Sequence, residues 1–151
     1  MLSVERDPKN RVYQELIDLC FEVCDEFHLV IRTDMGAIKD LEEIINKFKA
    51  SLKEMRSEST WASTTLGDNQ TANVYYFYAD GNAKSIIKMI AKSLFQWEMP
   101  NLPEDLSFFK QGKVWLATSS HEKQCFIFPE NETEASKVMG IEGLRVEALD
   151  E

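Results

Sequence analysis

Five consecutive residues, Val74-Tyr75-Tyr76-Phe77-Tyr78, restrict the fold of this chain more than any other feature. Aromatic and β-branched side chains favour strands, and successive side chains of a strand point to opposite faces of its sheet. A strand over residues 73–79 therefore has two largely apolar faces, which cannot both lie in water. The run predicts a central strand.

Three segments carry apolar residues at helical spacing and predict the main helices. The first covers residues 8–26, with Asp7 and Pro8 as N-cap and first helical position. The second covers residues 38–56 and the third residues 83–97, which ends before Pro100. A short acidic helix is expected over residues 130–139.

The rest of the chain predicts strands and loops around these helices. Residues 105–128 contain a β-hairpin and a further strand, and residues 27–32 are either a short strand or a continuation of the first helix. Residues 57–72 predict an ordered loop around a single tryptophan, and residues 143–151 a last strand or a frayed tail. We therefore expect one α+β domain over residues 1–151, in two layers, with a mainly antiparallel sheet of about four to five strands packed by three main helices.

Charge and composition exclude several functional classes. A net charge of -9 argues against nucleic-acid binding, which needs cations to neutralise phosphates. No apolar run approaches the roughly 18–20 residues that span a bilayer, so we expect no membrane partner. An odd number of cysteines, with a carboxylate already at Glu5, predicts a cytoplasmic location.

The negative charge is concentrated at the two ends. Residues 1–26 hold seven acids and three bases, residues 130–151 hold seven acids and two bases, and residues 27–129 hold twelve of each. One interpretation is that charged terminal segments keep the chain soluble. The other is that the two ends lie together and form an acidic surface for a basic protein partner.

A few residues could carry chemistry. His121 beside Glu122 could act in acid–base catalysis if the segment turns, and Glu104 with Asp105 could form an acid pair. Each site also has a structural interpretation: His121 as a histidine in a turn, and Glu104 with Asp105 as part of a solvated turn. Trp61, Trp115 and His121 are the candidate binding residues.

Two cysteines and a histidine in the first part of the chain suggest a metal site, but their spacing argues against it. Cys20, Cys24 and His28 are four residues apart, so on a helix the outer two would be about 12 Å apart, too far for one ion. Cys20 also falls on the apolar stripe of the first helix, where a free thiol behaves as a small hydrophobe. We expect no metal and no cofactor.

The middle of the chain resembles a group of small bacterial proteins of unknown function. The resemblance covers roughly residues 59–128 and rests on four stretches of sequence. They are Ser59-Thr60-Trp61 through Thr65-Leu66, Thr71-Ala72-Asn73-Val74-Tyr75, Asn101-Leu102-Pro103-Glu104-Asp105-Leu106, and Trp115 with His121-Glu122. It implies a bacterial cytoplasmic protein in which these segments act together, and it implies no activity.

Two functional hypotheses follow. The absence of a complete nucleophile, metal or phosphate motif favours a non-enzymatic protein-binding module, such as an immunity or inhibitor protein whose carboxylates block a basic toxin. The alternative is a small-molecule-binding or hydrolytic protein with a cleft near Trp61, Glu104, Asp105 and His121. A homodimer through the aromatic strand or the first helix is compatible with either.

Overall fold

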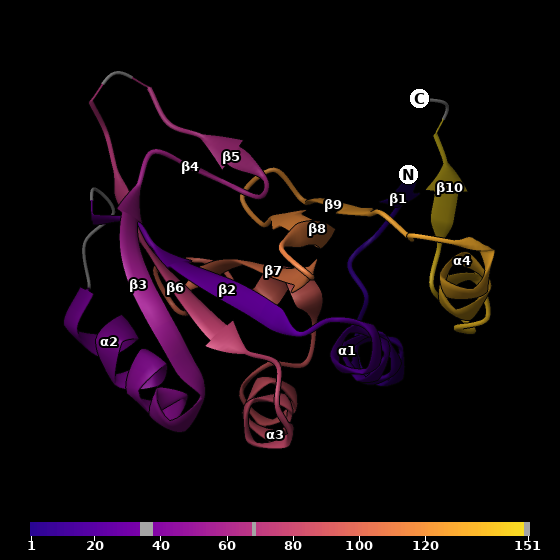
Figure 1. The fold of residues 1–151 in the computed structure, drawn as a ribbon, viewed down its shortest axis with the longest axis horizontal. Coiled ribbons are helices and arrows are strands. Elements are labelled where there is room, and N and C mark those ends of the chain that lie inside the picture. The colour runs from indigo at the N-terminus through magenta and orange to yellow at the C-terminus, as the bar shows by residue number, and fades with distance from the viewer. Residues whose placement is uncertain (34–37, 68, 150–151) are drawn as a thin grey trace.

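The computed structural model describes residues 1–33, 38–67 and 69–149. Within this part of the chain the fold is α+β, and its main sheet is antiparallel, as expected. The sheet has eight strands rather than about four to five, in the order β10-β1-β9-β8-β7-β2-β6-β3 (Figure 1). The strands are β1 (Leu2–Val4), β2 (Glu26–Ile31), β3 (Leu52–Glu58), β6 (Ala72–Tyr78), β7 (Glu104–Lys110), β8 (Lys113–Ser119), β9 (Gln124–Ile127) and β10 (Val146–Ala148).

The remaining elements are helices and one short ribbon. The helices are α1 (Arg11–Val23), α2 (Ile38–Lys47), α3 (Gly81–Ile90) and α4 (Glu132–Met139), with short 3-10 turns η2 (Lys49–Ser51) and η3 (Leu94–Gln96). The ribbon pairs β4 (Thr60–Trp61) with β5 (Thr64–Thr65), inside the segment expected to be a loop. No helix in the described residues is long and apolar enough to cross a membrane.

The aromatic strand β6 is an interior strand, second from the edge of the sheet, and it pairs with β2 on one side and with the edge strand β3 on the other. Its two faces are covered differently. Phe77 belongs to the large core that α1, α2 and α3 form with the sheet, whereas Val74 belongs to a smaller cluster under Trp61 of the ribbon. Figure 1 shows these three helices on one side of the sheet and the ribbon on the other. Both apolar faces of the strand are thereby removed from water.

Residues 48–56 were expected to continue the second helix, and this prediction is wrong. The helix α2 ends at Lys47, and the chain then forms η2 and the edge strand β3. Leu52 and Met55 fit a helical stripe by spacing, yet they are 40% and 48% exposed. The strand exists because β6 has a free edge to pair with, and tertiary pairing of this kind overrides local propensity.

The boundaries of the first helix also differ from those expected. The N-cap is Asn10 rather than Asp7, whose carboxylate instead accepts a hydrogen bond from the Phe95 amide at 2.9 Å. The helix stops at Val23, and the following residues form β2 rather than more helix. Residues 83–97 divide similarly into α3, which Asp80 caps by accepting from the Ala83 amide, and η3.

The chain ends form part of the sheet. Strand β1, which the sequence did not indicate, lies between β9 and β10, and Ser3 is paired with Glu147. The tail is therefore a last strand rather than a frayed end. This pairing joins the two acidic terminal segments in one part of the molecule.

Candidate functional site

A β-bulge at the start of β7 places two carboxylates in the protein interior. Between the pairs His28–Ser107 and Val30–Glu104, strand β7 has one more residue than β2. Asp105 lies in this bulge with a φ of 58°, a left-handed conformation that aspartate tolerates better than most residues. Bulges redirect side chains. Here Glu104 and Asp105, only 1% and 2% exposed, both reach the turn between β8 and β9.

His121 lies in that turn and bridges two carboxylates. Its Nε2 lies 2.9 Å from Glu104 Oε1, and its Nδ1 lies 2.9 Å from Glu98 Oε1. A neutral imidazole has one N–H and can donate to only one of them. Both ring nitrogens are thus engaged by carboxylates. Neither ring nitrogen is free to accept a proton from a substrate in this arrangement.

Asp105 anchors the ribbon to the sheet. Its Oδ2 accepts a hydrogen bond from Trp61 Nε1 at 2.9 Å, and its Oδ1 accepts one from the Ser120 amide at 3.0 Å. Trp61 is 6% exposed, so its indole fills space between the ribbon and the sheet. The four residues of the hypothetical cleft, Trp61, Glu104, Asp105 and His121, thus converge on one cluster.

Burial dominates the electrostatics of this cluster. It raises the pKa of Glu104, and the adjacent Asp105 raises it further, while His121 and Arg32 act in the opposite direction. Burial also raises the pKa of Asp105, against the hydrogen bonds from Trp61 and Ser120. Both carboxylates are therefore more easily protonated than in water.

Replacing Glu104 with glutamine is expected to weaken the pH dependence of stability. A raised pKa in the folded state stabilises the fold fully below the unfolded value of about 4.5, and this contribution is lost as pH rises through the folded pKa. The free energy of unfolding should therefore fall less in Glu104→Gln than in the wild type between about pH 4 and pH 7. Each unit by which the pKa of Glu104 is higher in the folded than in the unfolded state contributes about 1.4 kcal/mol to this difference. Urea unfolding across this range measures the difference.

Glu122→Gln is the matched control, because Glu122 is exposed in the same turn and makes no hydrogen bond or ion pair among the described residues. It should leave the pH profile unchanged. Parallel profiles for the wild type and Glu104→Gln would contradict the raised pKa of Glu104.

Further polar groups are buried on the same face of the sheet. His28 is fully buried between the rings of Tyr76 and Phe109, and burial lowers its pKa to about 3. Its ring nitrogens have no hydrogen bond of good geometry among the described residues, although the Asp105 backbone opposes the shift slightly. The ring is therefore neutral at physiological pH, and it lies on β2 rather than on the first helix.

The cysteines are not activated. Cys20, Cys24 and Cys125 are all free and buried. Burial raises the pKa of Cys125 to about 12, and it raises the pKa of the other two thiols as well. Thiolates are the reactive form, so these side chains act as core residues. The described residues contain no group of three or more His, Cys, Asp or Glu side chains suited to hold a metal ion.

Trp115, the other candidate binding tryptophan, is 1% exposed. Its Nε1 donates to Glu134 Oε1 at 2.8 Å, and Lys110 binds the second oxygen of the same carboxylate. This contact fixes α4 against β7 and β8. Glu134 therefore has a structural role that the sequence did not reveal.

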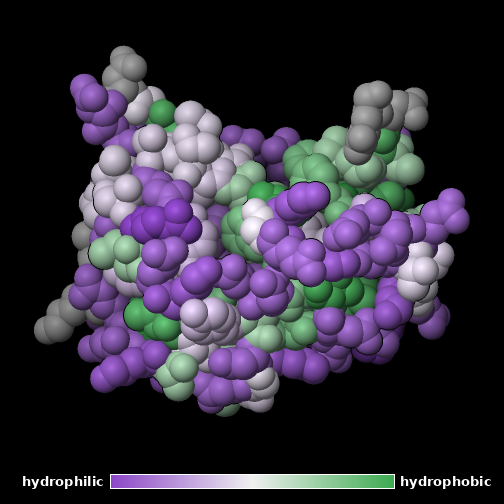
Figure 2. Space-filling model, viewed as in Figure 1, coloured by the Kyte–Doolittle hydropathy of each residue, from purple (hydrophilic) through white to green (hydrophobic). Residues whose placement is uncertain are grey.

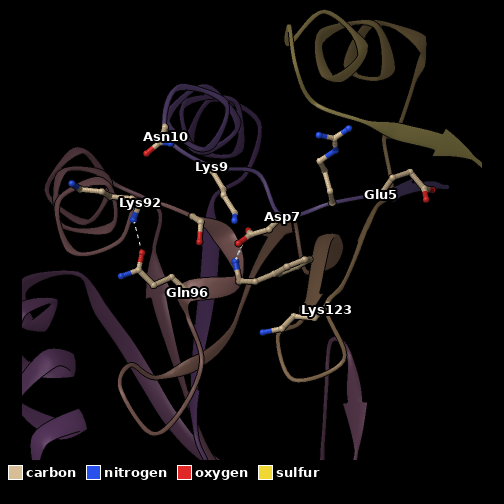
Figure 3. Close-up of a pocket in the computed structure, with 10 residues that line it drawn as sticks. Glu5, Asp7, Lys9, Asn10, Lys92, Gln96 and Lys123 are labelled. Atoms are coloured by element: carbon tan, nitrogen blue, oxygen red, sulfur yellow. Dashed lines mark hydrogen bonds between the residues drawn. The ribbon is translucent and has the colours of Figure 1, made fainter.

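A pocket of about 680 Å³ lies beside the cluster, between the β1–α1 connection, the α3–η3 connection and the β8–β9 turn (Figure 3). Of the turn, only Lys123 lines it, and this lysine bonds Glu98 at 2.9 Å. The other charged lining residues are Glu5, Arg6, Asp7, Lys9 and Lys92. In Figure 3 the Lys92 side chain extends away from Lys9. The mixed charges do not select an anion or a cation as ligand.

The acids of the two ends fall into two groups. Many are neutralised by ion pairs, among them Glu15 with Arg11, Asp18 with Lys84 and Lys88, Glu22 with Lys137, Glu26 with Lys53, and Glu130 and Glu134 with Lys110. Asp7 and Asp25 each accept a backbone hydrogen bond instead. The second group is exposed, and its carboxylates have no ion pair or hydrogen bond among the described residues: Glu5, Glu132, Glu142 and Glu147. The second group lies on β1, α4, β10 and their connections, so the free negative charge of the ends is concentrated there.

Comparison with known proteins adds no relative: no family model, curated protein or solved structure matches the chain. The resemblance of residues 59–128 to small bacterial proteins therefore stays a prediction. Sequence reasoning found Trp61, Glu104, Asp105 and His121 individually, but it missed Glu98 as the second partner of His121. Glu98 follows η3 outside any motif, so no local signal could have identified it.

Proposed function

We propose that this protein is a non-enzymatic protein-binding module whose contact surface is the joined acidic ends. The observation that carries the proposal is the pairing of β1 with β10, which places Glu5, Glu142 and Glu147 in one region. Carboxylates without internal partners are available to a basic partner, for which they increase the association rate and the specificity.

The same region also offers apolar surface. Figure 2 shows hydrophobic residues gathered around β10, at the upper right, on a face that is otherwise largely hydrophilic. Ala148 is exposed, Phe128 is 36% exposed and Met139 is 60% exposed. Apolar surface with a charged rim is typical of protein interfaces. An immunity or inhibitor protein against a basic toxin is one function of this kind.

The geometry of the His121 cluster supports this proposal over the alternative of a hydrolytic or small-molecule-binding cleft. Both His121 nitrogens are occupied by carboxylates, and Asp105 is committed to Trp61 and Ser120. The cluster joins the ribbon, β7 and the β8–β9 turn, as a structural polar network does.

Charge reversal at the joined ends is expected to abolish binding. In the double variant Glu142→Lys/Glu147→Lys, a basic partner captured by the wild type from cells that make this protein should be lost. The association rate of the wild type with that partner should fall at least about tenfold as salt rises from about 50 to about 500 mM, because screening removes electrostatic steering. Capture followed by kinetic binding measurements at several salt concentrations tests both.

The control is Glu42→Lys/Glu43→Lys on α2, whose carboxylates are also exposed and without ion pairs among the described residues. It changes the net charge by the same amount and should retain the partner. Equal loss in the two double variants would show that only total charge matters. A partner whose binding survives reversal at the ends would overturn the proposed surface.

A further inference from the structure

The strand β3 is a long, open edge of the main sheet. It is the last strand in the sheet order, and among the described residues it pairs with β6 alone. Residues 52–57 are all exposed. Unpaired backbone groups along such an edge are a template for another strand. The opposite edge, β10, has three residues, which is too short to be a comparable template.

The side chains of β3 form a charge pattern that favours one particular partner. Glu54, Arg56 and Glu58 follow one another on one face, and Met55 lies on the other face, 48% exposed. The Arg56 guanidinium lies 4.3 Å from the centre of the Tyr76 ring and 3.3 Å from both Glu54 and Glu58. The tyrosine thus holds a cation between two carboxylates at the edge of the sheet.

We propose that β3 pairs antiparallel with the β3 of a second copy of this chain, about a two-fold axis through Met55. Residues facing each other across such an axis must lie on the same face of the sheet, so the axis passes through a residue. With the axis at Met55, Glu54 faces the partner's Arg56, Arg56 faces the partner's Glu54, and Met55 faces the partner's Met55. Opposite charges and apolar pairs across strands are stabilising.

Several alternative registers bring like charges together. An axis at Glu54 opposes two glutamates, and an axis at Lys53 opposes two lysines. An axis at Arg56 opposes two arginines and also Glu54 with the partner's Glu58. Like charges directly opposite are destabilising, so charge disfavours these registers.

An axis at Ser57 also pairs opposite charges, Arg56 with the partner's Glu58, but it lacks the apolar pair between the two Met55 side chains, and an axis at Leu52 forms no pair of opposite charges. Only the axis at Met55 combines two ion pairs with an apolar pair. The two intermolecular ion pairs replace the exposed pair that Arg56 makes with Glu54 inside one chain.

The dimer is expected to be weak. The register of β3 against β6 shifts at Lys53, so the regular ladder between copies is limited to the neighbourhood of residues 54–56. Interfaces of small area form transient complexes. The 17.4 kDa chain should therefore be monomeric at about 10 µM and should approach twice this mass near 1 mM.

Sedimentation equilibrium with charge-swapped variants tests the proposal. Glu54→Arg and Arg56→Glu each place like charges opposite one another twice, so each should weaken self-association at least about tenfold. The double variant Glu54→Arg/Arg56→Glu should regain it, because both pairs are restored with opposite polarity. An equimolar mixture of the two single variants should form a heterodimer that neither forms alone, which also shows that both are folded.

Three outcomes would overturn the inference: a wild type that stays monomeric up to about 1 mM, a single variant that dimerises as well as the wild type, or a mixture of the single variants that stays monomeric. The reversal at Glu142 and Glu147 should not affect dimerisation, because β10 is at the other edge of the sheet. Failure of the dimer therefore leaves the proposed binding surface intact, and failure of that surface leaves the dimer intact.

Discussion

Replacing Phe27 with alanine is expected to lower the free energy of unfolding by about 3–5 kcal/mol. Phe27 is fully buried on β2, and its ring stacks on Phe77 with a centroid distance of 5.0 Å. The rings of Phe108, Phe21 and Phe48 lie 5.7, 5.7 and 5.9 Å away. Truncation would leave a cavity among four rings on strands and helices that cannot all move inward, so the full cavity penalty applies.

Urea unfolding followed by circular dichroism measures this loss. Phe128→Ala is the control, because Phe128 is 36% exposed and its truncation should cost less than about 1 kcal/mol. If Phe27→Ala does not fold, Phe27→Leu provides a milder test and should still destabilise measurably. Equal losses at positions 27 and 128 would show that the aromatic cluster is not the centre of the core.

Replacing Glu134 with alanine is expected to cost about 2–4 kcal/mol. The Glu134 carboxylate accepts hydrogen bonds from Lys110, from Trp115 Nε1 and from the Glu130 amide. Its removal leaves the buried indole N–H of Trp115 and the Glu130 amide without this partner, whereas the N-cap bond from the Glu134 amide to Asn131 is kept. The loss should appear in thermal and urea unfolding.

The stability that Glu134 contributes changes with pH in the opposite direction to the contribution of Glu104. Burial alone would raise the pKa of Glu134, but the hydrogen bonds from Lys110, the Glu130 amide and Trp115 together lower it. A lowered pKa stabilises the fold above the usual value, and this contribution is lost in acid. The gap between wild type and Glu134→Ala should therefore narrow as pH falls below about 4.5.

Glu132→Ala is the matched control in the same helix, since Glu132 is exposed and has no ion pair among the described residues. We expect it to cost only a few tenths of a kcal/mol, from the helix dipole. A Glu134→Ala variant as stable as Glu132→Ala would rule out the role assigned to the Trp115–Glu134 contact.

The candidate site illustrates what spacing can and cannot predict. The sequence placed Glu104 and Asp105 at the start of a strand and His121 after another, but their meeting depends on the bulge at Asp105 and on a turn over residues 120–123. On regular strands, neighbouring side chains point to opposite faces, so the same residues would have been separated. The second carboxylate partner of His121, Glu98, follows η3 and belongs to neither segment, although it is only six residues before Glu104.

The sequence alone also left open which acidic residues of the two ends stay without an internal partner. Counting residues assigned the acids to two separate segments, whereas the β1–β10 pairing joins those segments. Lysines from the neutral middle of the chain, such as Lys84 and Lys110, then neutralise part of the acidic ends. Spatial pairing therefore selects which carboxylates stay available, and composition cannot.

The sequence by itself determined the α+β class, the antiparallel hairpin of β7 and β8 and the position of β6 inside the sheet rather than at its edge, because periodicity and turn residues act locally. Tertiary structure alone decided that residues 52–58 form a strand rather than helix, that the chain ends pair, and that four dispersed polar residues share one cluster. The physical reason is the same in each case. A strand is stabilised by the edge that it pairs with, and that edge is contributed by residues distant in the sequence.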